Sequence, residues 1–212
     1  MVYLWLYMRR KEFEKYEEKE YLEIMEKEQV GQLGVVDTND YPRIVPVNFV
    51  LYNGNIYFHG ALEGEKYELL QKNPKVTFSV YQPYSYIPSY FTSNIACQAT
   101  IFFKSVHIRG TGSLVEDFNE KIEVVIKLME KHQPEKKYDE IDINNPKYYH
   151  YMETTGIFCI TPSEITMKLK FGQNMNDNVI SHVISYLEER NQPIDLETIT
   201  EIKSRRPVKE KL

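Results

Sequence analysis

The sequence predicts a mainly β protein of the α+β class, in which a closed or partly closed antiparallel β-barrel carries helices around it. Three observations favour this fold. Short β-rich segments recur along most of the 212 residues. Asn53-Gly54 lies between two of these segments, and this pair is typical of the tight type I′ turn of a β-hairpin. The helical segments do not alternate regularly with strands, as they would around a doubly wound parallel sheet.

The first half of the chain is expected to be mostly β. Its predicted elements are a helix at 16–29, strands at 30–37, 43–52 and 55–59, a helix at 63–72 and a strand at 76–81. The first helix has Tyr21, Leu22 and Met25 at helical spacing. Thr38-Asn39-Asp40 is typical of a turn, and Asn73-Pro74 is expected to end the second helix.

The second half combines long β segments with helices. Its predicted elements are a loop at 82–95, a β stretch at 96–115 broken near Arg109-Gly110, a helix at 118–132, a helical turn at 148–152, a strand at 156–169 bent at Pro162, and helices at 176–190 and 196–205. The loop is rich in Pro, Ser and Tyr, and loops of this length are often functional. The apolar face of the helix at 118–132 is expected to consist of Ile122, Val125, Ile126 and Met129.

Composition limits the class of protein. At 42% hydrophobic residues, the chain can bury one sizeable core. A net charge of −5 with both signs mixed gives no general attraction to nucleic acid or to an anionic membrane. The N-terminal MVYLWLY is too short to span a bilayer, and positive charges follow it rather than precede it, unlike in a signal peptide. We therefore expect a cytoplasmic protein, in which residues 1–7 are a packing arm or precede a natural start at Met8.

The two cysteines and five histidines do not predict a metal site. Cys97 and Cys159 lie in apolar, strand-like segments, which predicts two buried, reduced thiols. The sequence has no Cys-x-x-Cys pair and no histidine pair with ligand spacing.

A candidate anion site lies at the start of the helix 63–72. Exposed N–H groups at a helix start favour an anion, Gly64 lets a ligand approach the backbone, and Lys66 adds a charge. The alternative is a solvated lysine on a surface helix. Arg43 has the same two interpretations, a phosphate ligand or an edge residue with its head in water.

The strand 43–52 and the residues around it offer further ligand contacts. Pro46 has no backbone N–H to donate to a neighbouring strand, which predicts that this position lies at a sheet edge, a bulge or an opening. The backbone groups of residues 45–48 could then contact the flat ring system of a ligand. His59 is either a hydrogen-bond partner or proton donor of a bound ring, or a structural histidine. Ser105 either points at a ligand or lies on the surface.

Two further groups of residues admit more than one interpretation. Tyrosines in two segments favour stacking on an aromatic ligand or a dimer interface. They are Tyr84, Tyr86, Tyr90, Tyr148, Tyr149 and Tyr151. The basic segment 203–211 is expected to be a solvated tail, because no helix-turn-helix pattern accompanies it.

Residues 42–80, PRIVPVNFVLYNGNIYFHGALEGEKYELLQKNPKVTFSV, resemble the FMN-binding split-barrel superfamily related to pyridoxamine 5′-phosphate oxidase, and within it the nitroimidazole-resistance (Nim-type) proteins. MRRKEF (8–13), VGQLGVVD (30–37) and KSVHIRGTGSLVED (104–117) match other segments of that family. KLKFGQNMNDNVISHVISYLEERNQPIDL (168–196) is similar to the end of the Pai-type flavin-binding regulators.

The resemblance implies a six-stranded antiparallel split barrel of Greek-key type with peripheral helices, and a homodimer that binds FMN in two clefts at its interface. It implies an FMN-binding domain at 8–170, a C-terminal helical extension at 171–212 and an N-terminal arm at 1–7. The implied cofactor-binding residues are Arg43, Val45, Pro46, Val47, Asn48, Phe58, His59, Gly60, Gly64, Lys66 and Ser105. His59 is also the implied catalytic residue, and no metal is implied.

The expected activity is that of an FMN-dependent oxidoreductase. A nicotinamide would reduce the flavin, which would then reduce a small aromatic or nitro compound. Two alternatives stay open. One is a module that binds FMN or haem without turnover, with His59, His107, His132, His150 or His182 as an axial ligand. The other is a Pai-type regulator acting through the C-terminal helices and the basic tail.

Overall fold

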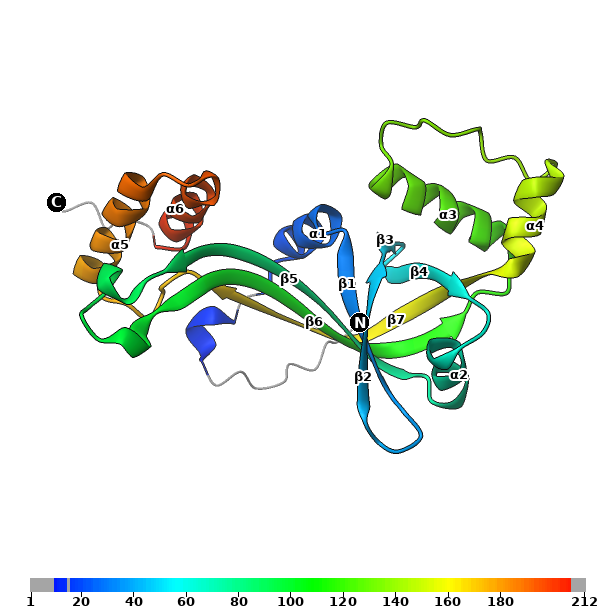
Figure 1. Ribbon diagram of the computed structural model, residues 1–212, viewed down its shortest axis with the longest axis horizontal. Helices are drawn as coiled ribbons and strands as arrows, with labels where there is room; N and C mark the ends of the chain where they lie inside the picture. The colour runs from blue at the N-terminus through cyan, green and yellow to red at the C-terminus, as the bar shows by residue number, and fades with distance from the viewer. Residues whose placement is uncertain (1–9, 15, 207–212) are drawn as a thin grey trace. The chain divides into compact units, whose positions relative to one another are not determined.

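The computed structural model describes residues 10–14 and 16–206 (Figure 1). The predictions for residues 1–7 and for a start at Met8 fall outside these residues. The contacts of the described chain divide it into two compact units. The first unit consists of Glu18–Val80 and Val106–Thr166, and the second of residues 10–14, 16–17, 81–105 and 167–206.

The fold is an α+β fold of the split-barrel class, built on an antiparallel sheet with the strand order β2-β1-β5-β6-β7-β4-β3. The strands are β1 (Val30–Val36), β2 (Pro42–Asn48), β3 (Val50–Tyr52), β4 (Asn55–Ala61), β5 (Lys75–Ile87), β6 (Thr100–Leu114) and β7 (Thr155–Lys170). The predicted class is confirmed, but the sheet has seven strands and not six. The predicted strand 43–52 divides at the buried Phe49, because the part before it pairs with β1 and the part after it pairs with β4.

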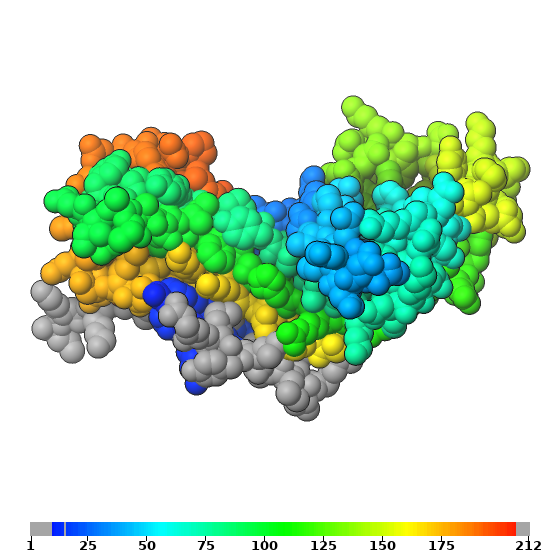
Figure 2. Space-filling model, turned by 60° about the horizontal axis from the view of Figure 1, so that its bottom comes forward, coloured from blue at the N-terminus to red at the C-terminus, as the bar shows by residue number. Residues whose placement is uncertain are grey.

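Two local predictions about this region are confirmed. Asn53 and Gly54 have φ angles of 49° and 78°, the positive values that a type I′ turn requires. Pro46 lies in β2, which is an edge strand of the sheet and so tolerates a residue without an N–H. The β1–β2 hairpin forms part of the surface in Figure 2, where its atoms are blue.

Three predictions about β5, β6 and their connection are wrong. β5 continues through 82–87, which were expected to be a loop, because its side chains continue to alternate and Gln82 and Tyr84 are buried. The connection to β6 is shorter than expected and contains two 3₁₀ helices, η2 (Ser89–Phe91) and η3 (Ala96–Gln98). β6 also runs without a break through Arg109-Gly110.

The described chain has six α-helices and one more 3₁₀ helix, η1 (Lys11–Phe13). The α-helices are α1 (Glu18–Lys27), α2 (Glu65–Lys72), α3 (Phe118–His132), α4 (Pro146–Thr154), α5 (Asp177–Arg190) and α6 (Pro193–Arg205). The bounds of α3 are as predicted, but its buried side chains are Val124 and Leu128. The four residues of the predicted apolar face, Ile122, Val125, Ile126 and Met129, are partly buried, and Val125 packs against the same core cluster.

In the first unit, β4 and β7 present two different faces to two helices. Val124 and Leu128 of α3 pack in one cluster with Tyr57, Ile157 and Cys159. Side chains alternate along a strand, so Phe58 and Gly60 point to the face opposite Tyr57 and His59. On that opposite face, Lys66 and Tyr67 of α2 contact the ring of Phe158.

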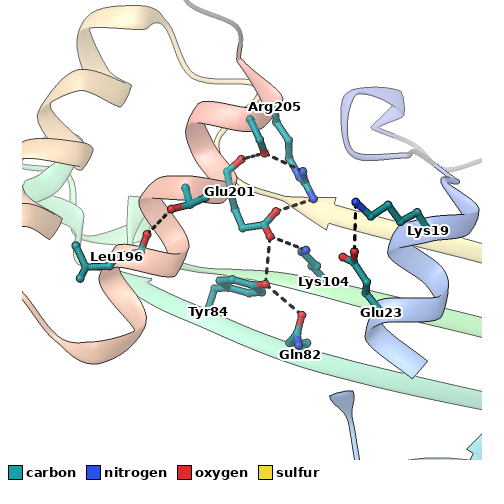
Figure 3. Close-up of polar contacts among 10 residues, drawn as sticks. Lys19, Glu23, Gln82, Tyr84, Lys104, Leu196, Glu201 and Arg205 are labelled. Carbon is teal, nitrogen blue, oxygen red and sulfur yellow. Dashed lines mark hydrogen bonds and ion pairs between the residues drawn. The ribbon is translucent and has the colours of Figure 1, made fainter. Parts of the chain in front are cut away.

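Buried ionic and polar contacts hold α6 within the second unit (Figure 3). Glu201 accepts a hydrogen bond of 2.7 Å from Lys104 Nζ of β6, and its other carboxylate oxygen lies 2.8 Å from Arg205 Nη2. The hydroxyl of Tyr84 lies 3.5 Å from Glu201 Oε1 and 3.2 Å from Gln82 Oε1. The prediction of a solvated basic tail from residue 203 is therefore wrong for Arg205, whose side chain is 10% exposed.

Asp195 of α6 anchors a second buried cluster. It is fully buried, accepts from Arg190 Nε at 3.0 Å and Nη2 at 2.5 Å, and accepts from Ser85 Oγ at 2.5 Å. Burial acts to raise the pKa of Asp195, but these hydrogen bonds outweigh it and lower the pKa below its usual value. The carboxylate thus joins α5, α6 and β5.

The two thiols are free but differ in exposure. Cys159 of β7 is buried, as predicted. Cys97 is exposed, which corrects the prediction, because IACQA forms the 3₁₀ helix η3 and not a strand. Among the helices of the described residues, none is long and apolar enough to cross a membrane.

We predict that Asp195→Ala lowers the free energy of unfolding by about 3 kcal/mol, because it leaves the Arg190 guanidinium without its buried partner. Urea denaturation of the full chain measures the loss. Glu189→Gln, which removes an exposed carboxylate from α5, should change stability by less than about 0.5 kcal/mol. Equal effects of the two substitutions would contradict a structural role for this cluster.

Candidate functional site

The start of α2 is built to leave its backbone donors open. Gly64 is the N-cap residue, with φ 89° and ψ 175°, a conformation that favours glycine. Its lack of a side chain means that no side-chain oxygen caps the N–H groups of the first turn. These donors and the helix dipole together favour an anion at this end.

Lys66 folds back from this first turn over the end of β4. A β-carbon added at Gly60 would lie 2.5 Å from Lys66 Nζ, so the ammonium occupies the space above that glycine. Nζ also lies 5.3 Å from the ring centre of Phe58 and 5.6 Å from that of Phe158. These two rings are buried and stacked, with centroids 5.1 Å apart, and they form an apolar floor below the charge.

The Lys66 ammonium is half-buried and has no carboxylate or hydrogen-bond acceptor among residues 10–14 and 16–206. Burial lowers the pKa of Lys66. A bound anion would offset this desolvation. The arrangement therefore fits a phosphate group better than it fits a solvated surface lysine.

Arg43 reaches the same corner from β2. Its Nε and Nη2 donate to Glu65 Oε2 at 3.2 and 2.8 Å, and both side chains are about half exposed. Glu65 is the first residue of α2, so the contact ties the edge strand to the helix start. Because an exposed ion pair of this kind is weak, Arg43 can exchange its carboxylate for a phosphate.

A separate cavity of about 480 Å³ lies on the α3 face of β4. Its lining includes His59, His132 and Asn48, with apolar walls from α3, α4 and β7. The lining residues are Asn48, His59, Val125, Leu128, Met129, His132, Tyr148, Tyr151, Met152, Thr155 and Ile157. Such a cavity suits a mostly apolar, flat molecule that needs a few polar contacts.

His59 lines this cavity with an exposed side chain. Partial burial, followed by repulsion from Lys66 and His132, lowers the pKa of His59 below its usual value of 6.5 and so favours the neutral form. The ring of His132 is oriented by the carbonyl oxygen of Phe49, which lies 3.0 Å from its Nε2. At pH 7, His59 can therefore offer both a donor and an acceptor nitrogen to a bound molecule.

The remaining predicted residues take different positions. Val45, Pro46, Val47 and Asn48 lie along β2, and only Val47 is fully buried. Phe58 is buried beneath Lys66, so it supports the site from below. Ser105 is buried in β6 and belongs to the second unit. Their contacts with a cofactor stay predictions.

Several residues of this region were missed in the sequence. Phe158 and Gly156 lie directly opposite Phe58 and Gly60 in the β4–β7 pairing. The spacings Phe-x-Gly in β4 and Gly-x-Phe in β7 could have indicated this pairing, but only if the register of the two strands had been known. Glu65 and His132 carry no local pattern that marks them. Tyr148 and Tyr151 line the cavity. This position is the one required by the interpretation that they stack on an aromatic ligand.

No group of three or more His, Cys, Asp and Glu side chains in the described part of the chain is arranged to hold a metal ion.

Comparison with known proteins identifies a family and a fold. The family model described as pyridoxamine 5′-phosphate oxidase matches residues 17–169. A search of curated proteins found no significant match.

The solved structures that are similar share the fold at low identity. A candidate 5-nitroimidazole antibiotic resistance protein from Bacteroides thetaiotaomicron is 20% identical, with a TM-score of 0.59 over 73% of this chain and 85% of its own. The flavocytochrome Anf3 from Azotobacter vinelandii is 16% identical, with a TM-score of 0.63 over 77% and 72%. A FAD and heme binding protein from Mycobacterium smegmatis is 12% identical, with a TM-score of 0.62 over 79% and 78%.

We predict that His59 titrates below pH 6.5 and that Lys66→Met raises its pKa toward 6.5, because one of two repelling charges is removed while burial remains. Histidine side-chain NMR over pH 4.5–8 measures both values. Lys72→Met, in the last turn of the same helix, should leave the titration of His59 unchanged. A wild-type pKa above 6.5 would contradict this description of the cavity.

We also predict that Gly60→Ala changes the free energy of unfolding by less than about 0.5 kcal/mol, because the new methyl group displaces only the flexible end of Lys66. The opposite glycine serves as the comparison. A β-carbon at Gly156 would lie 2.9 Å from the Phe158 ring and 3.1 Å from the Gly60 carbonyl oxygen, so Gly156→Ala should cost about 1–3 kcal/mol. Chemical denaturation of both variants tests the difference, and a large loss for Gly60→Ala would contradict it.

Proposed function

Since this chain belongs to the pyridoxamine 5′-phosphate oxidase family, we propose that it binds FMN and acts as an oxidoreductase on a small aromatic compound. Two similar structures support a flavin, because one is named a flavocytochrome and the other a FAD and heme binding protein. FMN is the flavin proposed because the candidate site offers one anion position beside an extended strand.

The observation that carries this proposal is the Lys66 ammonium above Gly60, which pairs with no carboxylate in the described part of the chain. In the proposal, the FMN phosphate accepts hydrogen bonds from Lys66 Nζ and from the first-turn N–H groups after Gly64. Arg43 lies at the same corner and adds a second cation on release from Glu65. The Phe58–Phe158 floor keeps water away from one side of the ammonium, which strengthens its attraction for the phosphate.

The edge strand β2 connects this corner to the His59 cavity. Arg43 contacts the start of α2, and Asn48 at the other end of the strand lines the cavity. The distance along an extended strand from one residue to the other is roughly 17 Å, comparable with the length of an extended FMN molecule. We propose that the ribityl chain and ring follow the exposed side of Val45–Asn48.

The cavity beside His59 is the proposed place for the organic substrate. Its apolar walls favour a neutral aromatic molecule, including a nitroaromatic one, over a strongly charged one. A bound FMN would supply hydride and electron transfer between a donor such as a reduced nicotinamide and the substrate. His59, neutral at pH 7, orients the substrate by a hydrogen bond and exchanges a proton with it.

A homodimer is part of this proposal. β2 is an edge strand whose neighbourhood exposes Tyr41 (68%) and Ile44 (71%), two large side chains that a second subunit would cover. A partner over this strand would also enclose a ring lying along it. The exposed apolar groups and the free strand edge support the dimer.

We predict that Lys66→Ala weakens FMN binding at least about tenfold and leaves riboflavin binding within about twofold, because only FMN carries the phosphate. Quenching of flavin fluorescence on titration with apoprotein measures both affinities. Lys72→Ala removes a charge from the other end of α2 and should leave both affinities unchanged. Equal losses for FMN and riboflavin in Lys66→Ala would rule out the phosphate role.

A further inference from the structure

The second unit contains a basic cavity that the proposed flavin site does not use. Its volume is about 680 Å³, and its charged lining residues are Arg10, Lys168 and Lys170. The other lining residues are Phe13, Thr92, Cys97, Gln98, Ala99, Thr100, Asn174, Met175, Asn176 and Val179. Within the described lining, then, cations, hydroxyls and amides are present but no carboxylate.

The position of the two lysines follows from strand alternation. Met167 and Leu169 of β7 are buried, so Lys168 and Lys170 point to the other face and into the cavity. Their Nζ atoms lie 5.4 and 5.7 Å from the ring centre of Phe103. The aromatic ring holds the two ammonium groups on one wall.

The N-terminal segment brings a third cation. Glu14 forms a β-bridge with Lys168, which holds the preceding 3₁₀ helix against the end of β7. The Arg10 guanidinium lies 5.8 Å from the ring centre of the buried Phe13. Burial, followed by the charges of Lys168 and Arg10, lowers the pKa of Lys170, as expected where like charges converge.

The turn after β7 contributes Asn174, Met175 and Asn176 to the lining of the same cavity. Gly172 has φ 76°, and its carbonyl oxygen accepts from the N–H of Met175 at 2.9 Å. Gln173 accepts from the N–H of Phe171 at 2.7 Å and donates to the carbonyl oxygen of Leu169 at 2.6 Å. The turn is held by its own hydrogen bonds, and Asn174 and Asn176 line the cavity. The side-chain oxygen of Asn176 also caps α5 by accepting from the N–H of Val179.

The cations have no compensating charge in the described chain. Lys170 donates to the hydroxyl of Thr100, while neither Lys168 nor Arg10 forms an ion pair with a residue in 10–14 or 16–206. Asp177, the nearest acidic residue in sequence to this turn, pairs with Arg206 at 3.6 Å. Three positive charges that line one cavity favour the binding of an anion there.

We infer that this cavity binds a small organic phosphate, of mononucleotide size or smaller, with Lys168, Lys170 and Arg10 as its cationic contacts. Lysine and arginine supply charge-assisted hydrogen bonds to the phosphate, and amide groups of Asn174 and Gln98 supply neutral ones. Phe13, Met175 and Val179 offer an apolar surface for the organic part. This site is independent of the proposed FMN phosphate position, which lies in the other unit.

Cys97 provides a readout that is local to the cavity. Its thiol is exposed and lines the cavity, whereas Cys159 is buried in the first unit. A bound ligand should slow alkylation of Cys97, and Cys159 serves as the internal control. The experiment uses FMN-saturated full-length protein at constant ionic strength, with inorganic pyrophosphate, AMP and adenosine as probes.

We expect pyrophosphate and AMP to slow alkylation of Cys97 saturably and adenosine to have no effect. The double variant Lys168→Gln/Lys170→Gln, which keeps side chains of similar size, should weaken both ligands by at least about tenfold. Lys203→Gln, an exposed lysine of the same unit, is the matched control and should bind like the wild type.

Four results would overturn the inference. Protection by adenosine equal to that by AMP would mean that the apolar surface alone binds. No protection by millimolar AMP or pyrophosphate, or equal protection in the double variant, would mean that the lysines are only solvated. If AMP no longer protected Cys97 in the Lys66→Ala variant, AMP would be binding at the proposed flavin site and not in this cavity. If Lys66→Ala left the affinity for FMN unchanged, only the proposed flavin site would be contradicted.

Discussion

The candidate site depends on one contact, the Lys66 ammonium held above the α-carbon of Gly60. The β4–β7 pairing sets Phe58 against Phe158 and Gly60 against Gly156, so the same register supplies both the aromatic floor and the space for the charge. The Gly64 conformation starts α2 at the point from which Lys66 can fold back. A charge placed in this way costs desolvation energy in the free protein, and an anion recovers it.

The two faces of β4 in the first unit have different chemical properties. The face with Phe58 and Gly60 is suited to a phosphate, and the face with His59 opens on an apolar cavity whose surroundings lower the pKa of the histidine. In the second unit, buried carboxylates have a structural role. Glu201 and Asp195 each accept from buried cationic and hydroxyl groups and hold α5 and α6 to the long strands, so these helices are integral to their unit.

Local chemistry made much of the fold predictable. The Asn53-Gly54 turn, the edge position of Pro46 and the bounds of α3 depend on short-range backbone preferences, and all three were predicted. The division of the strand at Phe49 and the continuation of β5 through 82–87 depend on which strands pair, and this is set by distant residues. For the same reason the sequence indicated Gly64 and Lys66 as a pair but not Phe158, Gly156 or the ring of His132. Cys97 was misplaced because its apolar neighbours form a 3₁₀ helix and not a strand.

The most direct test of this account is a double-mutant cycle on FMN affinity with Gly60→Ala and Lys66→Ala, measured by fluorescence titration. If Gly60 serves only to seat the ammonium on the phosphate, each single substitution weakens FMN binding. Adding Gly60→Ala to Lys66→Ala then causes no further loss beyond about twofold. Additive losses, or an unchanged FMN affinity in both single variants, would contradict the claim that this contact holds the phosphate.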